Sequence, residues 1–99
     1  MTILNTTFHV DKSVEVEVLG WIRNSYVKAA EAAGLYAPML TRILTDTAEG
    51  CAYALHLSAD TTESARRWNN GPGAALRRIL SGRYGERALT FTTYLEVLE

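Results

Sequence analysis

The first third of the chain passes from an alternating pattern to a helical one. In residues 2–10, β-branched and aromatic side chains alternate between two faces, of which the one with Leu4 and Phe8 is more apolar. A period of two predicts a strand. Over residues 13–33, apolar positions recur every three to four residues and Gly34 can end the segment, so this range predicts a helix.

The middle of the chain has the pattern of a β-hairpin. Pro38 opens a second stretch of strand-forming residues over about 39–46, and residues 51–57 form a third. The short link 47–50 contains glycine, as connections between paired strands commonly do. We therefore expect two antiparallel strands here.

The C-terminal part predicts an interrupted helix and a last strand. Asp60, with Glu63 three positions later, forms a capping-box pattern at a helix start. The run Gly71-Pro72-Gly73 must kink or interrupt this helix, which resumes and ends at Gly82. Residues 88–98 alternate again and predict a strand. One of its faces holds Leu89, Phe91, Leu95 and Val97, and the other holds Thr90, Thr92 and Tyr94.

The order strand, helix, strand, strand, helix, strand indicates an α+β fold of the ferredoxin-like type, in a single domain over residues 1–99. Right-handed crossovers place both helices on one face of an antiparallel sheet with strand order 4-1-3-2. Such a sheet leaves one face uncovered, and we expect its side chains to suit neither a core nor a free surface. We therefore expect this face to pack on a second copy as a two-fold homodimer. The expected open-face residues are Ile3, Asn5, Thr7, His9, Ala52, Ala54, His56, Ser58, Thr90, Thr92 and Tyr94.

Composition narrows the class of protein further. The 99 residues carry ten basic and eleven acidic side chains, a net charge of −1, which argues against a polycationic nucleic-acid binder. Cys51 is the single cysteine, which excludes a disulfide framework, and with two histidines we expect no metal site. The first residues show no targeting pattern, and no apolar run approaches the ~20 residues of a membrane helix. We expect a cytoplasmic protein without a cofactor, a membrane partner or a nucleic-acid partner.

Two histidines fall on neighbouring strands of the expected sheet and on its open face. In an antiparallel pair, His56 should lie nearer Asn5 or Thr7 than His9. A cluster of His56, Asn5 and Tyr94 could bind a small polar ligand or transfer protons, because imidazole titrates near neutral pH. The competing interpretation is that both histidines satisfy hydrogen bonds inside a dimer interface.

Arg42 stands on a strand that is otherwise mostly apolar. A charge buried beneath the helices would be costly, so we expect Arg42 on the open face or at an edge. There its fork could hold a carboxylate or phosphate, or it could pair with an acid of the partner chain. A shift of one residue in the hairpin register would change its face.

Six of the ten basic residues lie between positions 66 and 87, with Glu86 as the one acid, which gives a local charge of +5. Such a cluster could attract an anionic partner. The RNA-binding form of this fold, however, needs exposed aromatic side chains on the central strands, where this chain has Asn5, Thr7, Ala54 and His56. We therefore favour a solvated helix face.

Five short motifs spread over nearly the whole chain carry a resemblance to a known family. They are Asn5-Thr6-Thr7-Phe8-His9-Val10-Asp11, Trp21-Ile22-Arg23, Arg42-Ile43-Leu44, Arg83-Tyr84-Gly85-Glu86 and Phe91-Thr92-Thr93-Tyr94-Leu95-Glu96. In these motifs the chain resembles the uncharacterised DUF4286 proteins, which are small and mainly bacterial. The resemblance implies the dimeric α/β-barrel form of the ferredoxin-like fold, and therefore a homodimer, but it assigns no activity.

Two functions remain open. We favour a homodimeric ligand-binding or interaction module over an enzyme. The alternative is a haem-degrading or cofactor-free monooxygenase of the dimeric α/β-barrel class, which the chain resembles in topology. Those proteins use an asparagine on the first strand and a tryptophan near the second helix, roles that Asn5 and Trp68 match by position. The haem-degrading members also have an axial histidine on the second helix, whereas here no histidine follows His56, and Trp68 is more simply a helix residue packed on the sheet.

Overall fold

The computed structural model describes residues 1–44 and 50–99. The strands are β1 (Thr2–Asp11), β2 (Tyr36–Ile43), β3 (Gly50–Ala59) and β4 (Ala88–Glu96). The helices are α1 (Glu15–Trp21), α2 (Val27–Ala32), α3 (Thr62–Asn70) and α4 (Pro72–Tyr84). Three further helical segments are η1 (Lys12–Val14), the π-helical η2 (Ile22–Tyr26) and η3 (Gly85–Arg87).

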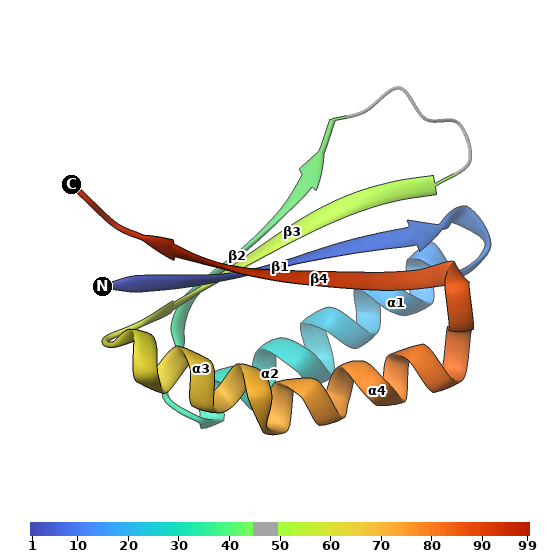
Figure 1. The fold of residues 1–99 in the computed structure, drawn as a ribbon. Helices are drawn as coiled ribbons and strands as arrows, with labels where there is room; N and C mark the ends of the chain where they lie inside the picture. The colour runs from blue at the N-terminus through green and yellow to red at the C-terminus, as the bar shows by residue number, and fades with distance from the viewer. Residues whose placement is uncertain (45–49) are drawn as a thin grey trace.

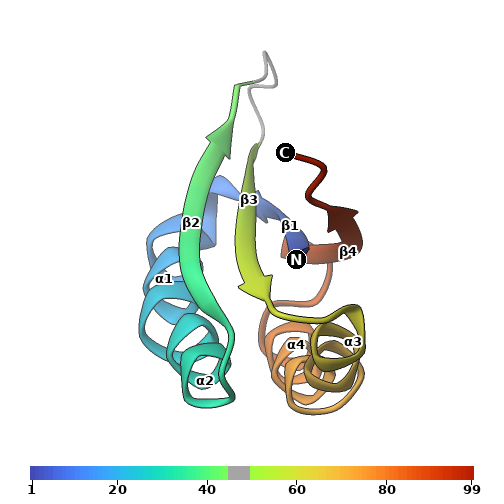
Figure 2. The same ribbon diagram turned by 90° about the vertical axis from the view of Figure 1, so that its left-hand side faces the viewer.

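The strands form one antiparallel sheet in the order β2-β3-β1-β4, and all the helices lie on one side of it (Figure 1). Figure 2 shows the two layers end on, with α1 and α2 beneath the β2 side and α3 and α4 beneath the β4 side. This arrangement confirms the ferredoxin-like α+β fold and the strand order expected from the sequence. No helix within residues 1–44 or 50–99 lies on the opposite face of the sheet.

The first crossover is one helical run in which η1, α1, η2 and α2 follow one another. Its buried residues, at positions 14, 18, 22, 26 and 30, are spaced by four throughout. A regular α-helix would rotate such a row by about 40° at each step. The wide turn of η2, in which the Val27 amide donates to the carbonyl of Ile22, lets the row stay on the sheet.

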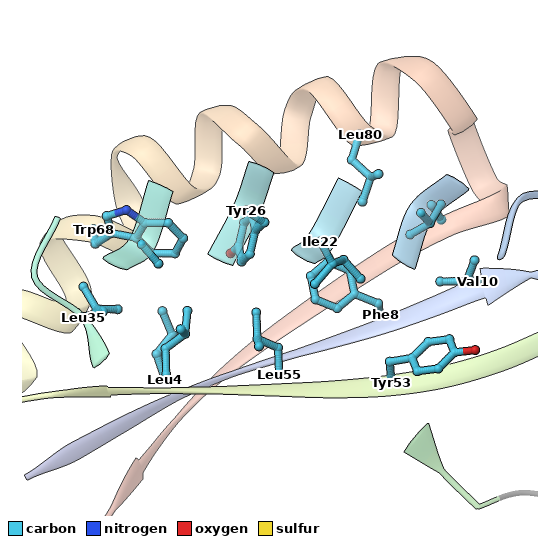
Figure 3. Close-up of a cluster of buried hydrophobic side chains, with 14 of the residues drawn as sticks. Leu4, Phe8, Val10, Ile22, Tyr26, Leu35, Tyr53, Leu55, Trp68 and Leu80 are labelled. Carbon is cyan, nitrogen blue, oxygen red and sulfur yellow. The ribbon is translucent and has the colours of Figure 1, made fainter. Parts of the chain in front are cut away.

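The core lies between the helices and the face of the sheet that they cover (Figure 3). At its centre the Tyr26 ring meets Phe8 and Trp68 edge to face, with ring centroids 5.7 and 5.1 Å apart. Leu4, Phe8 and Val10 reach the core from β1, on the parity that the sequence pattern assigned to it. The aliphatic residues around them come from every layer, including Ile22, Leu35, Leu55 and Leu80.

The second crossover is interrupted at Gly71, as the Gly-Pro-Gly run predicts. Its start differs by one residue from the expected one. Thr61 is the N-cap of α3 and its hydroxyl accepts from the Ser64 amide, 3.0 Å away, while Asp60 instead accepts from the Tyr36 hydroxyl at 3.0 Å. The helix also continues past Gly82 to Tyr84.

The hairpin strands are longer than expected, β2 at its start and β3 at both ends. β2 begins at Tyr36, with Pro38 inside it, and β3 extends from Gly50 to Ala59. Proline is tolerated there because β2 is an edge strand, so that no second neighbour requires its amide. The expected end of the second strand at 45–46, and positions 47–49 of the expected link, lie outside the described residues.

The two faces of β4 are the reverse of the expected ones. In the register with β1, Thr6 is opposite Thr92 and Thr7 is opposite Phe91. Since Thr6 faces the helices, Thr90, Thr92 and Tyr94 do so too, and Leu89, Phe91 and Leu95 face away from them. The expectation was wrong because α3 offers β4 a polar partner: the Asn69 amide donates to the hydroxyls of Tyr94 (2.9 Å) and Thr92 (3.4 Å).

Candidate functional site

The uncovered face of the sheet, called the open face below, is the first candidate site. Its centre comes from β1 and β3, whose register sets Asn5 opposite His56, Thr7 opposite Ala54 and His9 opposite Ala52. Residues directly opposite one another share a face, so the open-face residues of these two strands are those expected from the sequence. In particular, His56 lies nearer Asn5 than His9.

The Asn5 and His56 side chains form the polar centre of the open face. The Asn5 amide nitrogen donates to the hydroxyls of Thr7 (3.3 Å) and Thr93 (3.1 Å). Within the described part of the chain, its Oδ1 is buried without a hydrogen-bond partner, and the half-buried His56 ring has no partner either. Both groups therefore have hydrogen-bonding capacity left for something outside the chain.

The other histidine lies apart from this centre. His9 is four residues from Asn5 on the same strand, about 13 Å at the rise of a β-strand. Its exposed ring meets the Phe91 ring edge to face, with centroids 5.5 Å apart. The two histidines thus share the open face without sharing one binding position.

Tyr94 does not join Asn5 and His56, and this part of the expected cluster is wrong. Its ring lies on the helix side, where its hydroxyl accepts from Asn69 and the Arg66 guanidinium lies 5.4 Å from the ring centroid. Thr93 takes the position beside Asn5.

Two rows of exposed apolar side chains flank the polar centre. On β4 these are Leu89, Phe91 and Leu95, which are 46%, 60% and 41% exposed. On β2, Met39 and Ile43 are 54% and 39% exposed and face the same way, opposite His56 and Ala52. The alternation in the sequence showed the β4 row, but the assumption that apolar residues face the core put it on the wrong side.

Arg42 is at the sheet edge, one of the two places allowed for it, but on the helix side. It lies opposite Tyr53, whose hydroxyl accepts from its Nη2 at 3.4 Å, and its guanidinium lies 5.6 Å from the Tyr53 ring centroid. The cost of burial is avoided because its side chain is 61% exposed at the edge. Its acidic neighbour is Glu15 of the same chain, at 3.9 Å, rather than an acid of a partner.

Glu15 and Tyr53 form a hydrogen-bonded pair beside Arg42. The Tyr53 hydroxyl donates to Glu15 Oε2. Burial, and then this hydrogen bond, raise the pKa of Tyr53 to about 12. Hydrogen bonds from the Cys51 thiol and from Tyr53 hold the pKa of Glu15 below its ordinary value. Sequence reasoning did not identify this pair, since it depends on a residue at the start of α1 meeting one on β3.

Trp68 is buried in the core, 3% exposed, on the opposite side of the sheet from Asn5. The monooxygenase hypothesis needs these two residues in one site. A four-stranded sheet separates them, so they cannot act together on one substrate.

The arginines between positions 66 and 87 make several different contacts within the fold. Arg77 donates to the Tyr26 hydroxyl (2.7 Å) and to the carbonyl of Asn69 (2.8 Å), which joins α4 to both of its neighbours. Arg67 pairs with Glu63 at 3.1 Å, and Arg66 lies over Tyr94. The local charge of +5 is therefore partly used inside the fold and does not form one uniform surface.

The described residues hold neither a cluster of metal ligands nor a membrane-spanning helix. No three His, Cys, Asp or Glu side chains among them gather where they could hold a metal ion. No helix in residues 1–44 or 50–99 is long and apolar enough to cross a bilayer.

Solved structures with this fold include proteins of several kinds. One described as a candidate antibiotic biosynthesis monooxygenase from Deinococcus radiodurans has a TM-score of 0.68 at 13% identity, over 100% of this chain and 94% of that one. A point mutant of MhuD with two manganese protoporphyrin IX molecules per active site has a TM-score of 0.68 at 18% identity, over 100% and 96%. A dimeric ferredoxin-like protein from an uncultured marine organism has a TM-score of 0.61 at 12% identity, over 98% and 95%. At these identities the similarity shows the fold alone.

The sequence comparisons agree with the resemblance seen in the five motifs. No curated protein matches the sequence significantly. One family model does, described as a domain of unknown function (DUF4286), and it covers residues 1–98. The chain therefore belongs to the DUF4286 family.

Proposed function

We propose that this protein is a homodimeric interaction module whose open face is buried against a second copy. The observation that carries the proposal is the pair of apolar rows on a sheet face without helices, with Phe91 60% exposed at the centre of one row. Several large apolar side chains exposed on one face in this way are typical of an interaction site. Fully burying one such side chain contributes about 1.5–3 kcal/mol.

A second copy is the occupant that fits this face. A two-fold axis brings a surface onto itself, so the apolar rows of β2 and β4 meet apolar rows and the polar centre meets a polar centre. The partner can then supply the donor that Asn5 Oδ1 lacks within one chain. Structural neighbours described as dimeric ferredoxin-like proteins support the same assembly.

We also propose that the dimer works in a reducing compartment, the bacterial cytoplasm. Cys51 is a free, half-buried cysteine on β3, and the assembly requires no disulfide.

Multi-angle light scattering tests the homodimer with a matched pair of variants. Phe91→Lys places a charge in the β4 row, and Ile79→Lys makes the same kind of change at an exposed apolar residue (51%) on α4, on the helix side. We expect a dimer of 11.0 kDa subunits for the wild type and for Ile79→Lys, and a monomer for Phe91→Lys. Far-UV circular dichroism confirms that each variant is folded.

Two results would contradict the proposal. One is a wild-type chain that stays monomeric at micromolar concentration. The other is a dimer that Ile79→Lys dissociates and Phe91→Lys does not, which would put the interface on the helices.

A further inference from the structure

We propose that the protein binds a small monocarboxylate with an apolar body in a hollow between the first helical run and the β2 edge of the sheet. This hollow has a volume of about 280 Å³ and is lined by Leu19, Arg23, Leu40, Thr41, Arg42 and Tyr53. It lies on the helix side, away from the open face. The proposal therefore goes beyond the homodimer and does not depend on it.

The positive charge of the residues that line the hollow favours an anionic ligand. Two guanidinium groups line the hollow, Arg23 from η2 and Arg42 from β2, and none of the described residues that line it is acidic. Arg42 is already approached by Glu15 at 3.9 Å. Arg23, in contrast, has no hydrogen bond or ion pair with any residue of 1–44 or 50–99. With Glu15 counted, one positive charge is left over, which matches a carboxylate better than a phosphate dianion.

Two leucines beside the arginines favour a ligand with an apolar part over a small inorganic anion. Leu19 from α1 and Leu40 from β2 both pack partly on the core and present the remainder of their side chains to the hollow. Tyr53 adds a polar group from β3, while the Thr41 hydroxyl is on the other face of the sheet and donates to the carbonyl of Ala54 at 3.2 Å. The hollow thus combines two leucines with two arginines and a tyrosine, so a ligand that carries both an apolar part and an anionic group can use both kinds of contact.

The size of the hollow limits the ligand. At about 280 Å³ the hollow is at the lower end of the usual range for small-molecule sites, which suits a ligand of about ten non-hydrogen atoms. Benzoate and octanoate both satisfy this limit, one aromatic and one aliphatic.

The wide turn of η2 places Arg23 at the hollow. Leu19 and Arg23 are four residues apart and share a face of the helical run, so the turn that keeps Ile22 and Tyr26 on the core also fixes where Arg23 points. Widened turns of this type occur frequently at functional sites. The guanidinium of Arg42 is positioned independently, by the Tyr53 hydroxyl and ring.

Titrations of the full chain with benzoate and octanoate, followed by ¹H–¹⁵N NMR and by calorimetry, test the proposal. We expect saturable binding of at least one of the two at a single site, with shifts centred on Arg23, Arg42 and Tyr53. Benzamide, a neutral analogue of the same shape, should not bind. The identity of the better ligand distinguishes an aromatic acid from a fatty acid.

A matched pair of variants locates the site. Because a hydrogen bond to a charged group contributes about 1.5–3 kcal/mol, Arg23→Gln should weaken binding by about 10-fold or more. Arg78→Gln removes the same charge from an exposed residue of α4 that has no partner in the described chain, and it should leave the affinity unchanged.

Three outcomes would overturn the proposal: no saturable binding of either acid, equal binding of benzamide, or unchanged affinity in Arg23→Gln. The dimer-breaking variant Phe91→Lys should keep the affinity of the wild type, since the hollow lies on the other side of the sheet. Failure of the ligand site and failure of the homodimer can thus be told apart.

Discussion

At the scale of single residues, the group formed by Glu15, Tyr53 and Arg42 shows how a few side chains at one sheet edge control one another. The Tyr53 hydroxyl donates to the Glu15 carboxylate and accepts from the Arg42 guanidinium. The pKa of Glu15 is lowered and the pKa of Tyr53 is raised, so the two residues can be tested separately, one in acid and the other in alkali.

Tyr53 should ionise well above the ordinary pH range of a tyrosine. Its pKa of about 12 is above the value near 10 of an unfolded chain, so its contribution to stability is complete below about pH 10 and is lost as the pH rises through 12. In an alkaline titration followed by tyrosinate absorbance, Tyr53→Phe should lose a late step. A titration in which Tyr53→Phe removes an early step instead would contradict the buried, bonded phenol.

Glu15 should stabilise the fold at neutral pH and not in acid. Its pKa is lowered in the folded state, so its contribution is present above the unfolded value and is lost as the pH falls through the folded one. Urea unfolding should show Glu15→Gln less stable than the wild type at pH 7, with a difference that shrinks toward pH 3. Glu31→Gln, at an exposed residue of α2, serves as the control and should show little difference at either pH.

At the scale of elements, the helical runs were more predictable than the strand faces. The apolar positions that recur every three to four residues over 13–33 include the five that are buried, at 14, 18, 22, 26 and 30. The same reasoning failed on β4, because alternation shows that a strand has two faces but not which one meets the helices. That choice depends on Asn69, which hydrogen-bonds to Tyr94 and Thr92 from a different element.

Because α4 packs closely on α3 at only one of two glycines, alanine substitutions at Gly73 and Gly82 should change the stability in opposite directions. A Cβ on Gly73 would lie 2.8 and 2.9 Å from two atoms of the Trp68 ring, which is itself held against Tyr26. Gly73→Ala should therefore destabilise the protein by about 1–3 kcal/mol through overpacking. Gly82→Ala, in the same helix with no atom within 4 Å, should stabilise it by about 0.5–1 kcal/mol.

Urea unfolding of the two glycine variants side by side measures this difference. A stabilised Gly73→Ala would show that the Trp68 ring can move, and that α3 and α4 are packed less tightly than the distances indicate.

At the scale of the whole molecule, the sheet separates two surfaces with different chemistry. The open face could be anticipated from the sequence, because the antiparallel register of β1 and β3 sets Asn5 beside His56. The hollow on the other side could not. Arg23 and Arg42 are far apart in the chain, and only the packing of η2 against the β2 edge brings them to one site.

If the open face is buried between two copies, folding and assembly are coupled, and the melting temperature must depend on protein concentration. Unfolding then releases two chains, so a 100-fold increase in concentration favours the native dimer by about 2.7 kcal/mol, which amounts to several degrees. The wild type and Ile79→Lys should both show this increase in calorimetric scans. Phe91→Lys should melt at one temperature throughout, because its charge lies in the apolar row that the partner must cover. A wild-type melting temperature independent of concentration would mean that the apolar rows of β2 and β4 are not what stabilises the native state.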